Sequence, residues 1–72
     1  NVRVSRKPAL EEMKAAAKVA AIEETLGENG RVLLRYSGTE PLLRILIEGK
    51  DSDYIDREAD ALVEIISAEI GE

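Results

Sequence analysis

Three short segments of the chain are predicted to be strands, and the first of them alternates apolar and polar residues with the period of two that is typical of a strand with one buried face. They are residues 2–6 (VRVSR), 31–36 (RVLLRY) and 42–48 (LLRILIE). The last two flank a short polar stretch, so we predict that they pair as an antiparallel hairpin with a loop of about four to six residues. The two faces of the last segment then hold different residues: Leu43, Ile45 and Ile47 on one, and Leu42, Arg44, Leu46 and Glu48 on the other.

A first helix is predicted over residues 9–26, which contain neither Pro nor Gly and are rich in Ala, Glu and Lys. Val19, Ile22 and Leu26 repeat at spacings of three and four, as on one helix face. Pro8 suits the first turn, and Gly27 is placed to end the helix.

A second helix is indicated by the clearest amphipathic stripe of the chain, in which apolar residues recur every three or four positions. The stripe consists of Ile55, Ala59, Leu62, Ile66 and Ile70. Asp51, Ser52 or Asp53 can cap its start. Gly71 ends it.

The order of elements is therefore strand, helix, strand, strand, helix. Two helices with apolar stripes can cover one face of a small, mostly antiparallel sheet, so we predict an α+β fold, a two-layer sandwich. The other sheet face is expected to be partly open and to carry Arg3, Leu33, Arg35, Arg44 and Leu46 or a subset of them. A further strand from elsewhere would complete this sheet.

The composition of the chain excludes several kinds of site and argues against some classes of partner. The 72 residues make one small domain and include no Cys and no His, which excludes disulfides, thiolate metal sites and histidine bases. A net charge of -5 and 3% aromatic residues argue against general nucleic-acid binding. No apolar run approaches the roughly 20 residues of a membrane span, and no secretory signal opens the chain.

The hairpin loop RYSGTEP, residues 35–41, holds more hydrogen-bond donors than a chain reversal needs. Arg35 offers a planar fork that can bind two oxygens of an anion, and Arg44 follows shortly after the loop. Ser37 and Thr39 offer hydroxyls, while Gly38 tolerates positive φ, so that successive backbone N–H groups can form an anion-binding concavity. These residue types favour a dianion, most simply a phosphate.

From the residues alone, a solvated polar turn stays open as the alternative. Ser, Gly and Thr are ordinary turn residues. The two arginines could instead form ion pairs across the hairpin, Arg35 and Arg44 with Glu40 and Glu48. The loop also lacks the glycine spacing of known nucleotide-binding loops.

Other candidate chemistry is weaker. The acidic segment 51–60 (DSDYIDREAD) lacks the glycine and terminal glutamate of a calcium loop, so we interpret its acids as a solvated helix face. Tyr36 and Tyr54 are interpreted as packing residues, although Tyr36 adjoins the loop and could line its mouth. We therefore expect no metal site in this chain.

Residues 30–49, GRVLLRYSGTEPLLRILIEG, closely resemble the phosphate-binding loop in the C-terminal domain of the α-D-phosphohexomutases. The stretch SGTEP, followed two residues later by Arg and preceded by V-L-x-R, is most similar to the branch acting on glucosamine phosphates. The helix end TLGENG and the acidic helix that follows agree with that domain. The chain begins without Met and already in strand-like alternation, so we expect a piece of a longer protein.

The resemblance implies that residues 1–72 are the last of four domains in a cytoplasmic enzyme. Such enzymes interconvert 6-phospho and 1-phospho sugars, here those of glucosamine, through a bisphosphorylated sugar. A phosphoserine in the first domain, Mg²⁺ held by the second and a sugar-reading loop in the third supply the chemistry. No catalytic residue is therefore expected in this chain, which alone should be inactive.

The role that the resemblance carries over is capture of the substrate phosphate that is not being transferred, in a domain that closes as a lid. The residues matching the motif are Arg35, Ser37, Gly38, Thr39 and Arg44. Tyr36 departs from the Pro or Lys common in the family. The expected partners are a sugar phosphate and the other domains, with no nucleic acid or membrane. Two alternatives stay open: the same domain from a mannose- or glucose-phosphate mutase, and a module whose open sheet face binds a protein.

Overall fold

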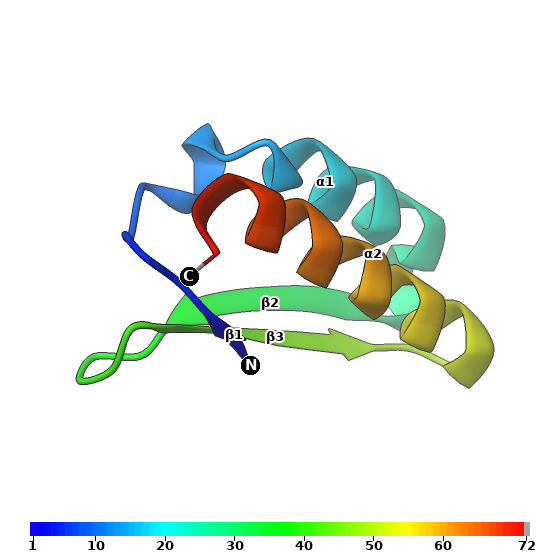
Figure 1. The fold of residues 1–72 in the computed structure, drawn as a ribbon. Coiled ribbons are helices and arrows are strands. Elements are labelled where there is room, and N and C mark those ends of the chain that lie inside the picture. The colour runs from blue at the N-terminus through cyan, green and yellow to red at the C-terminus, as the bar shows by residue number, and fades with distance from the viewer. Residues whose placement is uncertain (72) are drawn as a thin grey trace.

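The sheet of the protein has three antiparallel strands in the order β1-β3-β2 (Figure 1). A computed structural model describes residues 1–71 of the chain. The strands are β1 (Val2–Arg3), β2 (Arg31–Tyr36) and β3 (Leu42–Glu48). The helices α1 (Ala15–Leu26) and α2 (Ser52–Ile70) cover one face of this sheet. The predicted α+β two-layer sandwich is confirmed.

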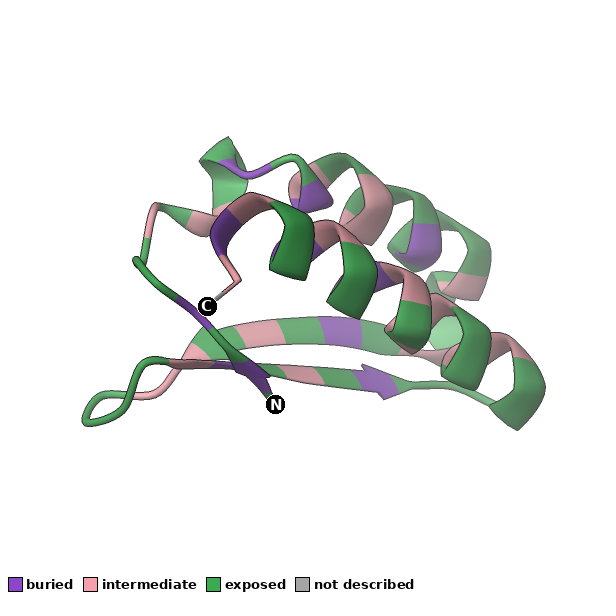
Figure 2. Cartoon of the chain, viewed as in Figure 1, coloured by how far each residue is buried: buried purple, intermediate pink, exposed green. Residues whose placement is uncertain are grey.

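The hydrophobic core fills the space between the helices and the sheet, as the purple segments of Figure 2 show. It is drawn from every strand and both helices because each contributes one apolar face. The buried apolar side chains are Val2, Val4, Met13, Ala15, Ile22, Val32, Leu43, Ile47, Leu62, Ile66 and Ile70. The opposite sheet face is open, and Leu33 and Leu46 there are 44% and 50% exposed.

Helix α2 matches its sequence pattern closely. Asp51 caps its start, since the carboxylate accepts a hydrogen bond of 3.1 Å from the backbone N–H of Tyr54. Leu62, Ile66 and Ile70 from the predicted stripe are buried. The amphipathic pattern therefore predicted both the length of this helix and the face that enters the core.

The predicted helix over residues 9–26 is wrong in its first part. Residues Leu10–Glu12 form only a 3₁₀ turn, η1, and Met13 is extended, with ψ of 153°. The extended backbone lets the Met13 side chain enter the core, where burial favours the break over a continuous helix. The end is as predicted: Gly27 is the C-cap at φ 58°, a conformation that favours glycine, and opens a second 3₁₀ turn, η2 (Gly27–Asn29).

The first strand is shorter than the predicted segment 2–6. After Arg3 the chain leaves β3 and runs along the end of α2, where Val4 forms an isolated bridge with Gly71. The Ser5 N–H donates to the Ile70 carbonyl at 2.7 Å, so these groups satisfy the carbonyl end of α2. The N-terminal segment thus ties the helix layer to the sheet.

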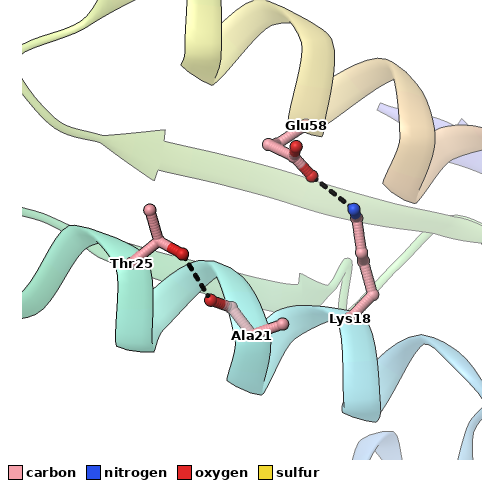
Figure 3. A network of polar contacts seen from close by, with 4 residues as sticks. All are labelled: Lys18, Ala21, Thr25 and Glu58. Carbon is pink, nitrogen blue, oxygen red and sulfur yellow. Dashed lines mark hydrogen bonds and ion pairs between the residues drawn. The ribbon is translucent and has the colours of Figure 1, made fainter.

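An ion pair links the two helices, as Figure 3 shows. The Lys18 Nζ atom of α1 lies 2.6 Å from the Glu58 Oε2 atom of α2. This oxygen is shielded from solvent and, within residues 1–71, has no hydrogen bond of good geometry, so the ammonium is its charge compensation. Nearby, the Thr25 hydroxyl donates to the Ala21 carbonyl within α1.

Candidate functional site

The hairpin of β2 and β3 places two arginines directly opposite each other. In its register Arg35 pairs with Arg44, next to the loop of residues 37–41. Both are exposed. Residues at a cross-strand position have Cβ atoms about 4.5–5.5 Å apart, and like charges there destabilise the sheet. The strand ends beside the loop therefore concentrate positive charge in an otherwise acidic chain.

Neither of these arginines has an acidic partner in the structure. Across residues 1–71, the Arg35 and Arg44 guanidinium groups make no hydrogen bond and no ion pair. Glu48 pairs instead with Arg31, which lies opposite it at the far end of the hairpin. The alternative in which Glu40 and Glu48 neutralise the two arginines is therefore wrong, and both forks remain available to an external anion.

A hollow of about 290 Å³ lies at this end of the hairpin. The residues that line it are Arg35, Tyr36, Ser37, Gly38, Thr39 and Arg44. The structure thus brings together all five residues predicted for the site, with Tyr36 beside them. A volume near 300 Å³ is at the small end of ligand sites, which suits a compact group rather than an extended ligand.

Hydrogen bonds within the loop fix part of its shape. The Ser37 N–H donates to the Leu42 carbonyl at 2.9 Å and closes the loop. The Ser37 hydroxyl oxygen accepts from the N–H groups of Thr39 and Glu40, at 3.3 and 3.2 Å. Those two N–H groups are thereby engaged, whereas the Ser37 O–H proton can still be donated to a ligand.

Gly38 differs from its sequence expectation. Its φ is not positive, so the concavity of successive N–H groups that positive φ would create is not formed. An added Cβ at Gly38 would meet no atom within 4 Å, so the space beside this residue is open. Its own N–H donates to no acceptor within residues 1–71. One backbone donor of the loop is therefore free.

Residues 1–65 match the family model described as phosphoglucomutase/phosphomannomutase, C-terminal domain. The chain belongs to this family. The expectation from the loop motif is thereby confirmed at the level of the family.

Two similar members of the family are named phosphoglucosamine mutases. The chain is 52% identical over 59 residues to phosphoglucosamine mutase 1 of Shewanella amazonensis, which covers 82% of the chain and 13% of that protein. It is 44% identical over 73 residues to phosphoglucosamine mutase of Pelobacter propionicus, covering all of the chain and 16% of the relative. The chain thus spans about a sixth or less of the length of these relatives.

Lys7 and Tyr36, which are not part of the family motif, make hydrogen bonds that position the loop. The Lys7 ammonium donates to the Ser37 carbonyl at 2.8 Å. The Tyr36 hydroxyl donates to the Pro8 carbonyl at 2.7 Å and lies 3.4 Å from the Met13 sulfur. Burial raises the pKa of this Tyr36 hydroxyl, and the nearby Arg6 charge opposes the shift. The packing role predicted for Tyr36 is confirmed.

The contribution of Lys7 was missed at the sequence level because no local pattern links it to a loop 30 residues further along the chain. From the sequence, only Pro8 of the Lys7-Pro8 pair has a predicted role, in the first turn of the helix. Only the crossover from β1 to η1 brings this ammonium to the loop.

Another hollow, of about 390 Å³, lies between α1 and the edge strand β2. Its lining is mostly apolar and includes the acids Glu11 and Glu23, so it does not suit an anion. Within residues 1–71 no group of three or more acidic side chains is placed to hold a metal. Neither helix in that part of the chain is long and apolar enough to cross a membrane.

Proposed function

We propose that the end of the hairpin binds the phosphate group of a sugar phosphate. The observation that carries the proposal is the Arg35–Arg44 pair, directly opposed, exposed and without an acidic partner among the described residues. Such a pair costs the fold stability until an anion lies between the charges. A phosphate dianion supplies two charges and enough oxygens for both forks.

Each of the five residues that match the loop motif has a defined part in this proposal. Arg35 and Arg44 each offer two parallel N–H donors to phosphate oxygens. Ser37 offers its remaining O–H proton, and Gly38 its free N–H. Thr39 contributes a hydroxyl from the tip of the loop. The open space beside Gly38 allows an oxygen to approach the backbone, which a side chain would obstruct.

For the whole protein we propose the activity named by its relatives, the interconversion of glucosamine 6-phosphate and glucosamine 1-phosphate in the cytoplasm. This domain would hold the phosphate that is not being transferred and close over the substrate as a lid. Binding energy at that remote group can orient the reacting one. The phosphoserine, the Mg²⁺ site and the sugar-reading loop would lie in other domains, so residues 1–72 supply binding and no chemistry.

The proposal is tested by titrating the 72-residue chain with glucosamine 6-phosphate while its backbone amide signals are followed by NMR. We expect the shifted signals to cluster at residues 35–44, and unphosphorylated glucosamine to leave them unmoved. Arg31→Gln is the matched control, because Arg31 shares the strand and the open face but pairs with Glu48. Shifts scattered over the surface, or none at millimolar ligand, would contradict the proposal.

A second candidate substrate is a mannose or glucose phosphate. It is favoured by the family model, whose description names phosphoglucomutase and phosphomannomutase. The phosphate hollow is the same in both readings, so only the full-length protein can separate them. Its turnover of glucosamine, mannose and glucose 6-phosphates, measured side by side, identifies the sugar.

A third candidate is a protein partner on the open sheet face, favoured by the exposure of Leu33 and Leu46. A double substitution to Ser at these positions distinguishes it from phosphate binding. We expect the phosphate-induced shifts at residues 35–44 to survive that substitution. Their loss would show that the apolar face, rather than the loop, controls the binding.

A further inference from the structure

The Lys7–Ser37 hydrogen bond fixes one peptide group of the loop. Lys7 lies in the crossover between β1 and η1, and its ammonium meets the Ser37 carbonyl at 2.8 Å. In Figure 1 this crossover rises from the sheet toward the helix layer, at the same end of the molecule as the hairpin loop. The adjacent Pro8 is itself held, because its carbonyl accepts from the Tyr36 hydroxyl at 2.7 Å. Two bonds therefore position the crossover against the loop.

The orientation of that carbonyl determines the direction of a donor. The carbonyl of Ser37 and the N–H of Gly38 belong to the same peptide unit, and no described peptide bond is cis. In a trans unit the C=O and the N–H point in opposite directions. Since Lys7 holds the carbonyl from the crossover side, the Gly38 N–H is directed away from Lys7.

The hollow lies on that other side. Arg35 and Arg44 occupy the strand positions that alternate with the core-facing residues, so their side chains belong to the open face of the sheet. Lys7 is not among the residues that line the hollow, whereas Gly38 is. A Gly38 N–H that is directed away from the crossover can therefore donate to the same anion as the two guanidinium groups, which line the same hollow.

We propose that Lys7 is a positioning residue for the phosphate site. It holds the Ser37 carbonyl so that the Gly38 N–H is presented to a phosphate oxygen, without contacting the phosphate itself. This inference rests on the proposed function of the loop. It adds to the site a residue from a segment about 30 positions upstream of the loop. It also names the partner of the free Gly38 N–H, which is an oxygen of a phosphate monoester or of inorganic phosphate.

The test uses inorganic phosphate and the amide spectrum of the 72-residue chain. In the unaltered protein, phosphate should move the Gly38 amide more than the Thr39 amide, whose N–H is engaged by the Ser37 hydroxyl. In Lys7→Met the Gly38 shift should be lost, and the dissociation constant should rise about two- to tenfold, as for one hydrogen bond. Lys7→Arg, which keeps a cationic donor, should retain most of the Gly38 shift and most of the affinity for phosphate.

The matched control is Arg6→Gln. Arg6 is a neighbouring cation close enough to influence Tyr36, but it donates to no loop carbonyl within residues 1–71. Its removal should raise the dissociation constant by about twofold or less, through screened charge alone. Equal losses in Arg6→Gln and Lys7→Met would reduce Lys7 to a general positive charge and overturn the positioning role.

The outcomes separate this inference from the function on which it rests. If phosphate moves residues 35–44 and Lys7→Met leaves the Gly38 shift intact, the role of Lys7 is wrong and the phosphate site stands. If phosphate moves nothing there in the unaltered chain, both are wrong. If Lys7→Met unfolds, a Gly38 shift no larger than that of Thr39 in the unaltered chain still overturns the inference.

Discussion

The two ends of the β2–β3 hairpin carry arginines in contrasting surroundings. At the far end Arg31 lies opposite Glu48 and forms an ion pair with it. At the loop end Arg35 lies opposite Arg44, and neither has an acidic partner within residues 1–71. Arg31 and Arg35 lie on the same strand and on the same face of the sheet. The two ends of the hairpin therefore differ in the residue that lies opposite each arginine. The first arrangement stabilises the sheet, while the second is costly unless an anion joins it.

The contrast shows how a binding site can be recognised from charge balance. An exposed ion pair contributes little to stability and needs no functional explanation. A like-charged pair at a cross-strand position opposes the fold, and it persists here in a protein of net charge -5. The local violation of a stability rule is therefore more informative than the number of donors in the loop.

The largest expected effect separates folding from binding at two adjacent residues of β3. Leu43 is fully buried and Arg44 is exposed. Leu43→Ala should lower the free energy of unfolding by about 2–5 kcal/mol because it leaves a cavity in the core. Arg44→Gln should leave stability unchanged or slightly raise it. Urea unfolding of the two variants checks this, and a large destabilisation by Arg44→Gln would give that arginine a structural role.

The next effect compares the two ends of the hairpin directly in the full-length protein, with the activity proposed for it. Arg35→Gln should lower kcat/KM by about 10- to 100-fold, since hydrogen bonds from a charged group contribute about 1.5–3 kcal/mol. Arg31→Gln, on the same face, should change kcat/KM by less than about twofold. Steady-state kinetics with the sugar phosphate measure both. Similar losses at the two positions would remove the distinction between the ends.

A smaller effect concerns the hydrogen bond from the Tyr36 hydroxyl to the Pro8 carbonyl, next to the loop end of the hairpin. Tyr36→Phe should lower the free energy of unfolding by about 0.5–1.5 kcal/mol, because the partly buried Pro8 carbonyl loses its donor. Burial raises the pKa of Tyr36 above 10.0, so the folded state keeps the proton longer than the unfolded chain does. Stability should therefore be fully present below pH 10 and fall as the pH rises above it.

Thermal unfolding between pH 8 and pH 11 measures this dependence. Tyr36→Phe should remove part of the decline above pH 10, while Tyr54→Phe serves as the matched control. A decline that is unchanged in Tyr36→Phe would mean that the hydroxyl is not buried in solution.

The smallest effect converts one end into the other. Arg44→Glu places an opposite charge across from Arg35, as Glu48 already lies across from Arg31. The new pair should raise stability by about 0.2–1 kcal/mol relative to the like-charged pair. Phosphate binding should be lost in the same variant. Chemical unfolding and a phosphate titration test the two halves, and retained phosphate binding would contradict the role of the arginine pair.

The sequence predicted most of the fold because its periodic segments are strong. The stripe of α2 and the hairpin strands were correct, since burial rewards the same spacing that the pattern displays. The helix predicted for the region before α1 was wrong. The alanine-rich sequence favours a helix there, but the burial of Met13 favours an extended break. Local propensity could not reveal a core contact made far along the chain.

The sequence predicted which residues line the hollow but not how they bond to one another, and their binding of phosphate stays a prediction. The residue types around Gly38 correctly gave the members of the hollow. They could not show that the Ser37 hydroxyl engages two loop N–H groups, or that Arg35 faces Arg44 without neutralisation. Those features depend on the register of the hairpin and on the path of the crossover that carries Lys7.

The most direct measurement follows the Nε–Hε signals of the arginines in one phosphate titration of the 72-residue chain. Arg35 and Arg44 should shift together and with one dissociation constant, while Arg31 stays in place because Glu48 already holds it. If Arg31 moves as far as the other two, or if Arg35 and Arg44 do not move, the loop end of the hairpin is not a phosphate site.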